Sequence, residues 1–174
     1  MFRQSKSVGE AIAVLGAAPD LAVSRMRLAV AEAPSDLSAH AQLVDWFLDQ
    51  PVSPALHREF DFHVQDEVRG GQDRRRIQTF ARVRGRQDFC PSDRALLLVS
   101  QAAARTGDNA LAVDVVRELM RVHPRSPLIP RAMWDVSQIQ ERAGQHAVAG
   151  RTRLAWVEGY PDDPYASQAR QSLA

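Results

Sequence analysis

The sequence is poor in cysteine, lysine and long apolar runs. Its one cysteine, Cys90, excludes an intrachain disulfide framework and a metal site built from several cysteines. No apolar run approaches the roughly 20 residues that span a bilayer, so no transmembrane segment is predicted. Glu10 interrupts the short apolar stretch of the first 20 residues, which makes a poor secretory signal. Cytoplasm is therefore the default expectation, with a periplasmic or membrane-associated location as the alternative.

The chain also lacks an excess of charge of one sign. Its 22 basic and 21 acidic residues give a net charge of +1, which excludes a polyanionic or polycationic tail. With 174 residues, 45% hydrophobic and 25% charged, it has the composition of an ordinary globular domain. All basic residues except Lys6 are arginine, whose planar fork can grip carboxylates or phosphates. Codon usage in a GC-rich genome explains the same bias more simply.

Motifs of catalysis and cofactor binding are missing as well. The sequence contains no HExxH, GxSxG, P-loop or GxGxxG pattern. Cys90 precedes Pro91 without a nearby base in the sequence, so an incidental thiol is expected. The chain is predicted to be a non-enzyme without a cofactor.

One segment, 57–67, gathers histidines and carboxylates. Glu59, His63 and Glu67 are spaced at four and would share one helix face. Because a metal site usually needs a further ligand from another element, a solvated acidic edge with local ion pairs is expected here, and no metal.

What the C-terminal half does contain is an internal repeat. A shift of 37 residues gives 11 identities in 34 positions, where chance would give roughly two or three. The identical pairs are Arg94/Arg131, Ala95/Ala132, Val99/Val136, Ser100/Ser137, Gln101/Gln138, Arg105/Arg142, Gly107/Gly144, Ala110/Ala147, Ala112/Ala149, Pro124/Pro161 and Pro127/Pro164.

Each copy predicts two helices joined by a tight turn. Ser92 is placed to cap a first helix that ends at Gly107, where a left-handed conformation costs little. A second helix over 108–122 ends before Pro124. Its apolar side is spaced at three and four, and comprises Ala112, Val115, Val116 and Leu119.

The same start signal occurs three times along the chain. A capping side chain stands directly before proline at Ser53-Pro54, Ser126-Pro127 and Asp163-Pro164. Each pair predicts the beginning of a new helix, and the last begins a closing helix over 164–173.

The N-terminal half is helical too, but less regular. Predicted helices cover 7–16, 20–33, 36–49, 54–69 and 73–86. Within 54–69 an apolar stripe recurs at every fourth residue: Leu56, Phe60, Val64 and Val68. Almost no segment alternates as a strand would. The fold class is therefore all-α, with an irregular part of degenerate repeats over 1–91 and two repeats over 92–174, in one continuous domain.

The spacing of Gly107, Ala112, Val116, Leu119 and Pro124 resembles the tetratricopeptide repeat (TPR), a helix-turn-helix unit of about 34 residues. The junctions at 123–132 and 160–169 resemble those of bacterial envelope TPR proteins of the TolA-binding and outer-membrane assembly lipoprotein type. The resemblance implies a TPR-like helical-hairpin solenoid. Two departures stand out: Ala103 and Gln140 replace the usual first-helix aromatic, and Arg153 stands where the second helix commonly has one.

In such a solenoid the first helix of each pair builds the concave wall. On an ideal helix, Arg94, Gln101 and Arg105 lie within about 40° of one another. Their equivalents one repeat later are Arg131, Gln138 and Arg142, and the resemblance places Leu97 and Trp134 beside them. Paired donors next to apolar surface would suit a peptide that carries carboxylates. The alternative is a solvated face neutralised by neighbouring acids such as Glu141.

The densest basic stretch is Arg69 to Arg86, with seven arginines in 18 residues. Arg75, Arg82 and Arg86 are predicted to share a solvent face opposite an apolar stripe of Ile77, Phe80 and Val83. Nucleic-acid phosphates would use such a patch, but no aromatics interleave for base stacking. Nucleic acid is therefore the least favoured partner.

These patterns together predict a protein- or peptide-binding adaptor with a concave groove lined by arginine and glutamine. The alternative is a structural or self-associating module of a larger membrane-associated bacterial assembly, in which the chain would form homo-oligomers. Light scattering over a concentration series would distinguish the two.

Overall fold

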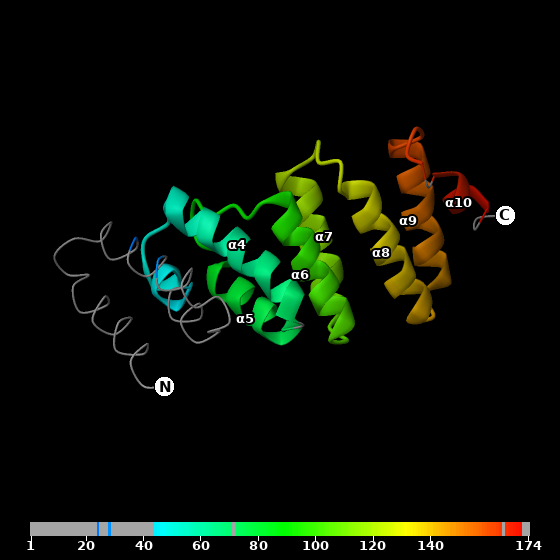
Figure 1. Cartoon of the computed structure of the whole chain (residues 1–174). Coiled ribbons are helices and arrows are strands. Elements are labelled where there is room, and N and C mark those ends of the chain that lie inside the picture. The colour runs from blue at the N-terminus through cyan, green and yellow to red at the C-terminus, as the bar shows by residue number, and fades with distance from the viewer. Residues whose placement is uncertain (1–23, 25–27, 29–43, 71, 165, 172–174) are drawn as a thin grey trace. The chain divides into compact units, whose positions relative to one another are not determined.

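A computed structural model describes residues 24, 28, 44–70, 72–164 and 166–171, and all regular structure among them is helical (Figure 1). The all-α prediction is confirmed for these residues. The predicted helix 7–16, most of 20–33 and the start of 36–49 lie outside them. The chain divides into two compact units, 1–63 and 64–174. Both predicted repeats fall within the second unit.

The first unit contains the start of helix α4 (Pro54–Gly70). As predicted, this helix begins at Pro54, and the Ser53 hydroxyl accepts a hydrogen bond from the Leu56 N–H at 3.2 Å. Leu56 and Phe60 of the predicted stripe are buried. Phe47, on the preceding helical segment 44–49, is also buried and meets Trp46 edge to face at 5.0 Å between ring centroids.

The second unit is a stack of helical hairpins. Its helices are α5 (Asp73–Val83), α6 (Asp93–Arg105), α7 (Asn109–Val122), α8 (Ile129–Arg142), α9 (His146–Gly159) and α10 (Ala166–Gln171). Helix α6 packs on α7 and α8 packs on α9, so each predicted repeat forms one hairpin (Figure 1). Contacts of α5 with α6 and of α7 with α8 continue the stack.

The backbone repeats as the sequence does. Gly107 and Gly144 end the first helix of each hairpin with φ angles of 85° and 74°, the left-handed conformation predicted for Gly107. Ser92 caps α6 by accepting from the Ala95 N–H at 3.1 Å. The two hairpins therefore share the geometry of their turns.

Replacing Gly107 by alanine should lower the free energy of unfolding by about 1 kcal/mol, because a Cβ strains a left-handed residue even where space is open. Chemical denaturation measures the loss. Gly159→Ala is the matched control, since this glycine ends α9 in equally open space and no positive φ angle is found there. Equal losses at both positions would contradict the assignment.

Several predicted boundaries differ from the structure. Helix α5 ends at Val83 rather than at 86, because Arg84 leaves the helical conformation with a ψ angle of 127° and Gly85 follows with a positive φ angle of 81°. Helix α8 begins only at Ile129, after Ser126-Pro127. The Ser126 hydroxyl accepts from the Leu128 N–H at 3.1 Å and donates to the Asp93 carboxylate at 2.6 Å. This serine therefore fastens the loop to the start of α6 instead of capping α8.

The closing helix α10 covers Ala166–Gln171, within the predicted 164–173. None of the helices in the described part of the chain combines the length and apolar character needed to cross a bilayer.

Candidate functional site

A cleft of about 350 Å³ opens between α6 and α8, the first helices of the two hairpins. The cleft is lined by Ser100, Gln101, Ala104, Arg105, Arg131, Asp135, Gln138, Ile139 and Arg142. Five of the eight predicted groove residues are among them: Gln101, Arg105, Arg131, Gln138 and Arg142. The 37-residue period explains this grouping, because it puts the same face of successive first helices side by side.

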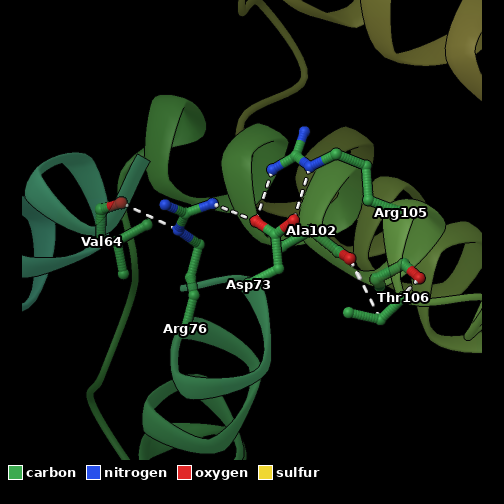
Figure 2. A network of polar contacts seen from close by, with 7 residues as sticks. Val64, Asp73, Arg76, Ala102, Arg105 and Thr106 are labelled. Carbon is green, nitrogen blue, oxygen red and sulfur yellow. Dashed lines mark hydrogen bonds and ion pairs between the residues drawn. The ribbon is translucent and has the colours of Figure 1, made fainter. Parts of the chain in front are cut away.

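Arg105 is already engaged by a carboxylate at the start of α5. Its Nε and Nη2 donate to the two Asp73 oxygens at 2.7 and 2.6 Å, a bidentate pair that Figure 2 shows. Such a pair uses one whole edge of the guanidinium fork. Arg105 therefore contributes positive potential to the cleft but has little capacity left for a ligand carboxylate.

Asp73 holds a second guanidinium on its other side. Arg76 is 0% exposed, donates through Nε to the Val64 carbonyl at 2.9 Å, and lies 3.2 Å from Asp73 through Nη1 (Figure 2). The pKa of Asp73 is lowered, first by its hydrogen bonds with Arg105 and then by the charges of Arg105 and Arg76. The same carboxylate raises the pKa of Arg105. Asp73 thus fastens α5 to α6 beside the cleft.

Arg131 is partly engaged by an acid on its own helix. Its Nε lies 3.2 Å from the Asp135 carboxylate, one turn further along α8. The Gln101 amide of α6 donates to the same carboxylate at 2.9 Å and so joins the two hairpins across the cleft. Sequence reasoning missed Asp135 because its equivalent in the first repeat is Leu98. The signal in the sequence that could have revealed it is its position four residues after Arg131, which allows an ion pair within one helix.

Arg142 differs from the other two cleft arginines because its guanidinium is not paired with a carboxylate of the described residues. Its Nε donates to the Gln138 carbonyl at 3.2 Å, which orients the side chain along the helix. Among the residues that the structure describes, no carboxylate lies within ion-pair distance of it. The repeat explains the difference from Arg105, because a shift of 37 residues puts Ala110 at the position of Asp73.

The remaining predicted groove residues lie elsewhere. Arg94 is exposed at the start of α6 and does not line the cleft. Leu97 is only 9% exposed and belongs to the apolar interior. Trp134 is half-buried against α9, where it meets Trp156 edge to face with 5.7 Å between ring centroids. The apolar contacts of the cleft are Ala104 and Ile139 instead.

Arg153, which stands where the second helix of a repeat commonly has an aromatic residue, is accommodated in α9 by polar and aromatic contacts. Only 5% exposed, it pairs with Glu141, donates to the Ser137 hydroxyl at 3.3 Å, and stacks 5.6 Å from the centroid of the Trp134 ring. Glu141, expected as a groove neutraliser, therefore serves α9. A shift of 37 residues aligns Trp134, Arg153 and Trp156 with Leu97, Val116 and Leu119, so a cation–aromatic cluster replaces an aliphatic one.

The predicted basic patch of Arg75, Arg82 and Arg86 does not form one helix face. Helix α5 ends at Val83, which puts Arg86 in the following turn, and both Arg75 and Arg86 are half-buried. Arg82 is exposed, whereas Phe80 and Val83 are buried as predicted. The expectation that all three arginines point to solvent holds for Arg82 and is wrong for the other two: Arg75 is half-buried within α5, and Arg86 lies beyond the end of the helix.

Cys90 has a neighbour that the sequence did not reveal. Its sulfur lies 4.0 Å from His123 Nε2, but that nitrogen is 2.7 Å from the Pro91 carbonyl. When Nε2 carries the proton it donates to this carbonyl and cannot act as a base toward the thiol. His123 therefore ties the end of α7 to the loop before α6. In the described ranges, no three His, Cys, Asp or Glu side chains gather to hold a metal ion.

Comparison with known proteins places the fold. No family model and no curated protein matches the sequence. A crystal structure of MamA protein is 12% identical, with a TM-score of 0.51, over 99% of this chain and 80% of that one. Two crystal structures of nearly identical TPR-like repeats from a Podosopora anserina kinesin light chain are each 12% identical with a TM-score of 0.56. They cover 98% and 99% of this chain and 83% and 86% of theirs.

At this level of identity the similarity concerns the fold, which is a TPR-like helical repeat. The predicted α solenoid is thereby confirmed. The finer resemblance to envelope lipoproteins stays a prediction.

Proposed function

We propose that this chain is a protein-interaction adaptor that holds an extended, carboxylate-bearing peptide of its partner in the cleft between α6 and α8. The observation that carries the proposal is the state of Arg142, whose fork has no carboxylate partner among the described residues although it lines a polar cleft. A guanidinium fork is built for bidentate carboxylate binding.

The three cleft arginines have different roles in this proposal. Arg142 binds the ligand carboxylate, and Arg131 assists through the nitrogens that its pair with Asp135 leaves over. Arg105 contributes to the positive electrostatic potential of the cleft while it remains paired with Asp73. Gln138 lies between Arg131 and Arg142 on α8 and can bond the backbone of an extended ligand, as side-chain amides commonly do.

The cleft is already ordered, so binding a peptide would cost less conformational entropy than binding at a flexible site. Arg142 is oriented by Gln138, and the wall behind it is a packed hairpin. A preformed site loses little conformational freedom when a ligand arrives. The two repeats thus act as a rigid receptor.

Peptides that bind the purified chain can be selected from a displayed library of random sequences, and these peptides serve as the probe. Retained peptides should be enriched in Asp and Glu, and Arg142→Glu should weaken their binding about ten- to hundredfold, because it removes a charge-assisted pair and adds repulsion. Fluorescence polarisation with labelled peptides measures the change.

Arg151→Glu is the matched control, since it makes the same charge change on an exposed residue of α9 that does not line the cleft. Equal weakening by both variants would show a general charge effect and would refute the cleft as the binding site.

A further inference from the structure

The cleft is not uniformly basic, because its described lining includes one acid at a defined place. Asp135 lines it between Arg131 and Arg142 on α8, with 20% of its side chain exposed. The Gln101 amide holds one carboxylate oxygen without neutralising its charge. A ligand that lies along α8 therefore meets positive, negative and positive charge in turn.

The bond between Arg131 and Asp135 is easily exchanged. Arg131 is 63% exposed, and an exposed ion pair contributes only about 0–1 kcal/mol. A basic residue four positions before an acid is also the weaker orientation of such a pair on a helix, because it opposes the helix dipole. A cation from a ligand can therefore replace Arg131 on Asp135 at little cost.

We propose that the cleft recognises a bipolar peptide, with an acidic side chain on Arg142 and a basic side chain on Asp135. This inference rests on the proposed function and specifies its ligand. An acidic run would bring carboxylates close to Asp135, where like charges repel, whereas a ligand with one acid and one base satisfies both groups.

The geometry also sets the spacing of the two charges. Seven residues of helix separate the backbones of Asp135 and Arg142 by about 10 Å. The Arg142 side chain runs back toward Gln138, which brings its guanidinium up to one turn closer to Asp135. An extended peptide advances about 3.3 Å per residue. Successive side chains of an extended peptide point to opposite faces, so only an even separation turns both charges toward the cleft. The acid and the base of the ligand should therefore stand two residues apart.

The test uses labelled peptides, drawn from the selected set, that carry one Glu and one Arg at separations of one to five residues in both orders. Binding should peak at a separation of two, where both side chains face the cleft. Replacing the peptide Arg by Gln should weaken binding about three- to fivefold, the size of a partly exposed charge pair. With Asp135→Asn the same replacement should have no effect.

Asp114→Asn is the control, because this acid has the same kind of pair on its own helix, with Arg117, away from the cleft. If Arg142→Glu abolishes binding but peptides with acid alone bind as well as bipolar ones, the bipolar inference fails and the adaptor proposal stands. If no peptide is retained, or Arg142→Glu changes nothing, both fail.

Discussion

Replacing Asp73 by alanine is expected to lower the free energy of unfolding by about 2–4 kcal/mol. Most of the loss comes from Arg76, because its fully buried guanidinium loses a charged partner when the Asp73 carboxylate is removed. Arg105 contributes less, since half of its side chain is in water. Chemical denaturation followed by circular dichroism measures the change.

Asp114→Ala is the matched control, because it removes an acid from an ion pair in which both side chains are more than half exposed. Its effect should stay within about 0.5 kcal/mol. A loss at Asp73 no larger than this would contradict the structural role of the pair.

The contribution of Asp73 should also depend on pH. Its pKa in the folded chain is below the ordinary 3.8, mainly because Arg105 donates to it. A lowered pKa contributes stability that is fully present above the unfolded-state pKa and is lost as the pH falls through the folded-state pKa. The difference in unfolding free energy between the wild type and Asp73→Asn should therefore be constant near neutral pH and shrink below about pH 4. A difference that grew with acidity would reverse the sign and contradict the pairing.

Trp156→Ala is expected to cost about 3–5 kcal/mol, a typical loss for deleting a buried indole. Trp156 is 1% exposed and packs edge to face on Trp134, which Arg153 covers from α9. Its removal would open a cavity in the contact between α8 and α9. Thermal or chemical unfolding followed by circular dichroism, which does not depend on indole fluorescence, measures the loss.

Two conservative variants make this prediction specific. Trp156→Phe should cost much less than the alanine variant, because the indole N–H that it removes has no acceptor among the described residues. Arg153→Met should be close to neutral, because Glu141 is 43% exposed and stays hydrated after losing its partner. If Arg153→Met were as damaging as Trp156→Ala, the cluster would depend on its charge rather than on its packing.

The helices and turns of the second unit were readable from the sequence because their signals are local. Ser92 caps α6 and Gly107 ends it, each through contacts within a few residues. The grouping of Gln101 and Gln138 at one cleft followed from the repeat, since equal positions of stacked hairpins face the same way. The predicted end of α5 was wrong by three residues, because several weak stop signals compete between Val83 and Arg86.

The polar partners were not readable from local spacing. Asp73 meets Arg105 across 32 residues, Asp135 meets Gln101 across 34, and Asp93 meets Ser126 across 33. These separations are all close to one repeat, because each bond joins neighbouring layers of the stack. Periodicity within a single helix does not reveal such bonds. The pairing of Arg105 with Asp73, and the lack of a carboxylate partner for Arg142 among the described residues, therefore emerged only from the structure.

The hydrogen bond between Gln101 and Asp135 has a consequence for how the hairpins are aligned. Apolar seams between helices tolerate sliding, since one aliphatic contact replaces another at similar energy. A step of one residue would shift the carboxylate by about 1.5 Å, and a hydrogen bond of 2.9 Å does not survive such a shift. Together with the hydrogen bond between Ser126 and Asp93, this contact therefore fixes the register of two layers whose apolar surfaces alone would let them slide.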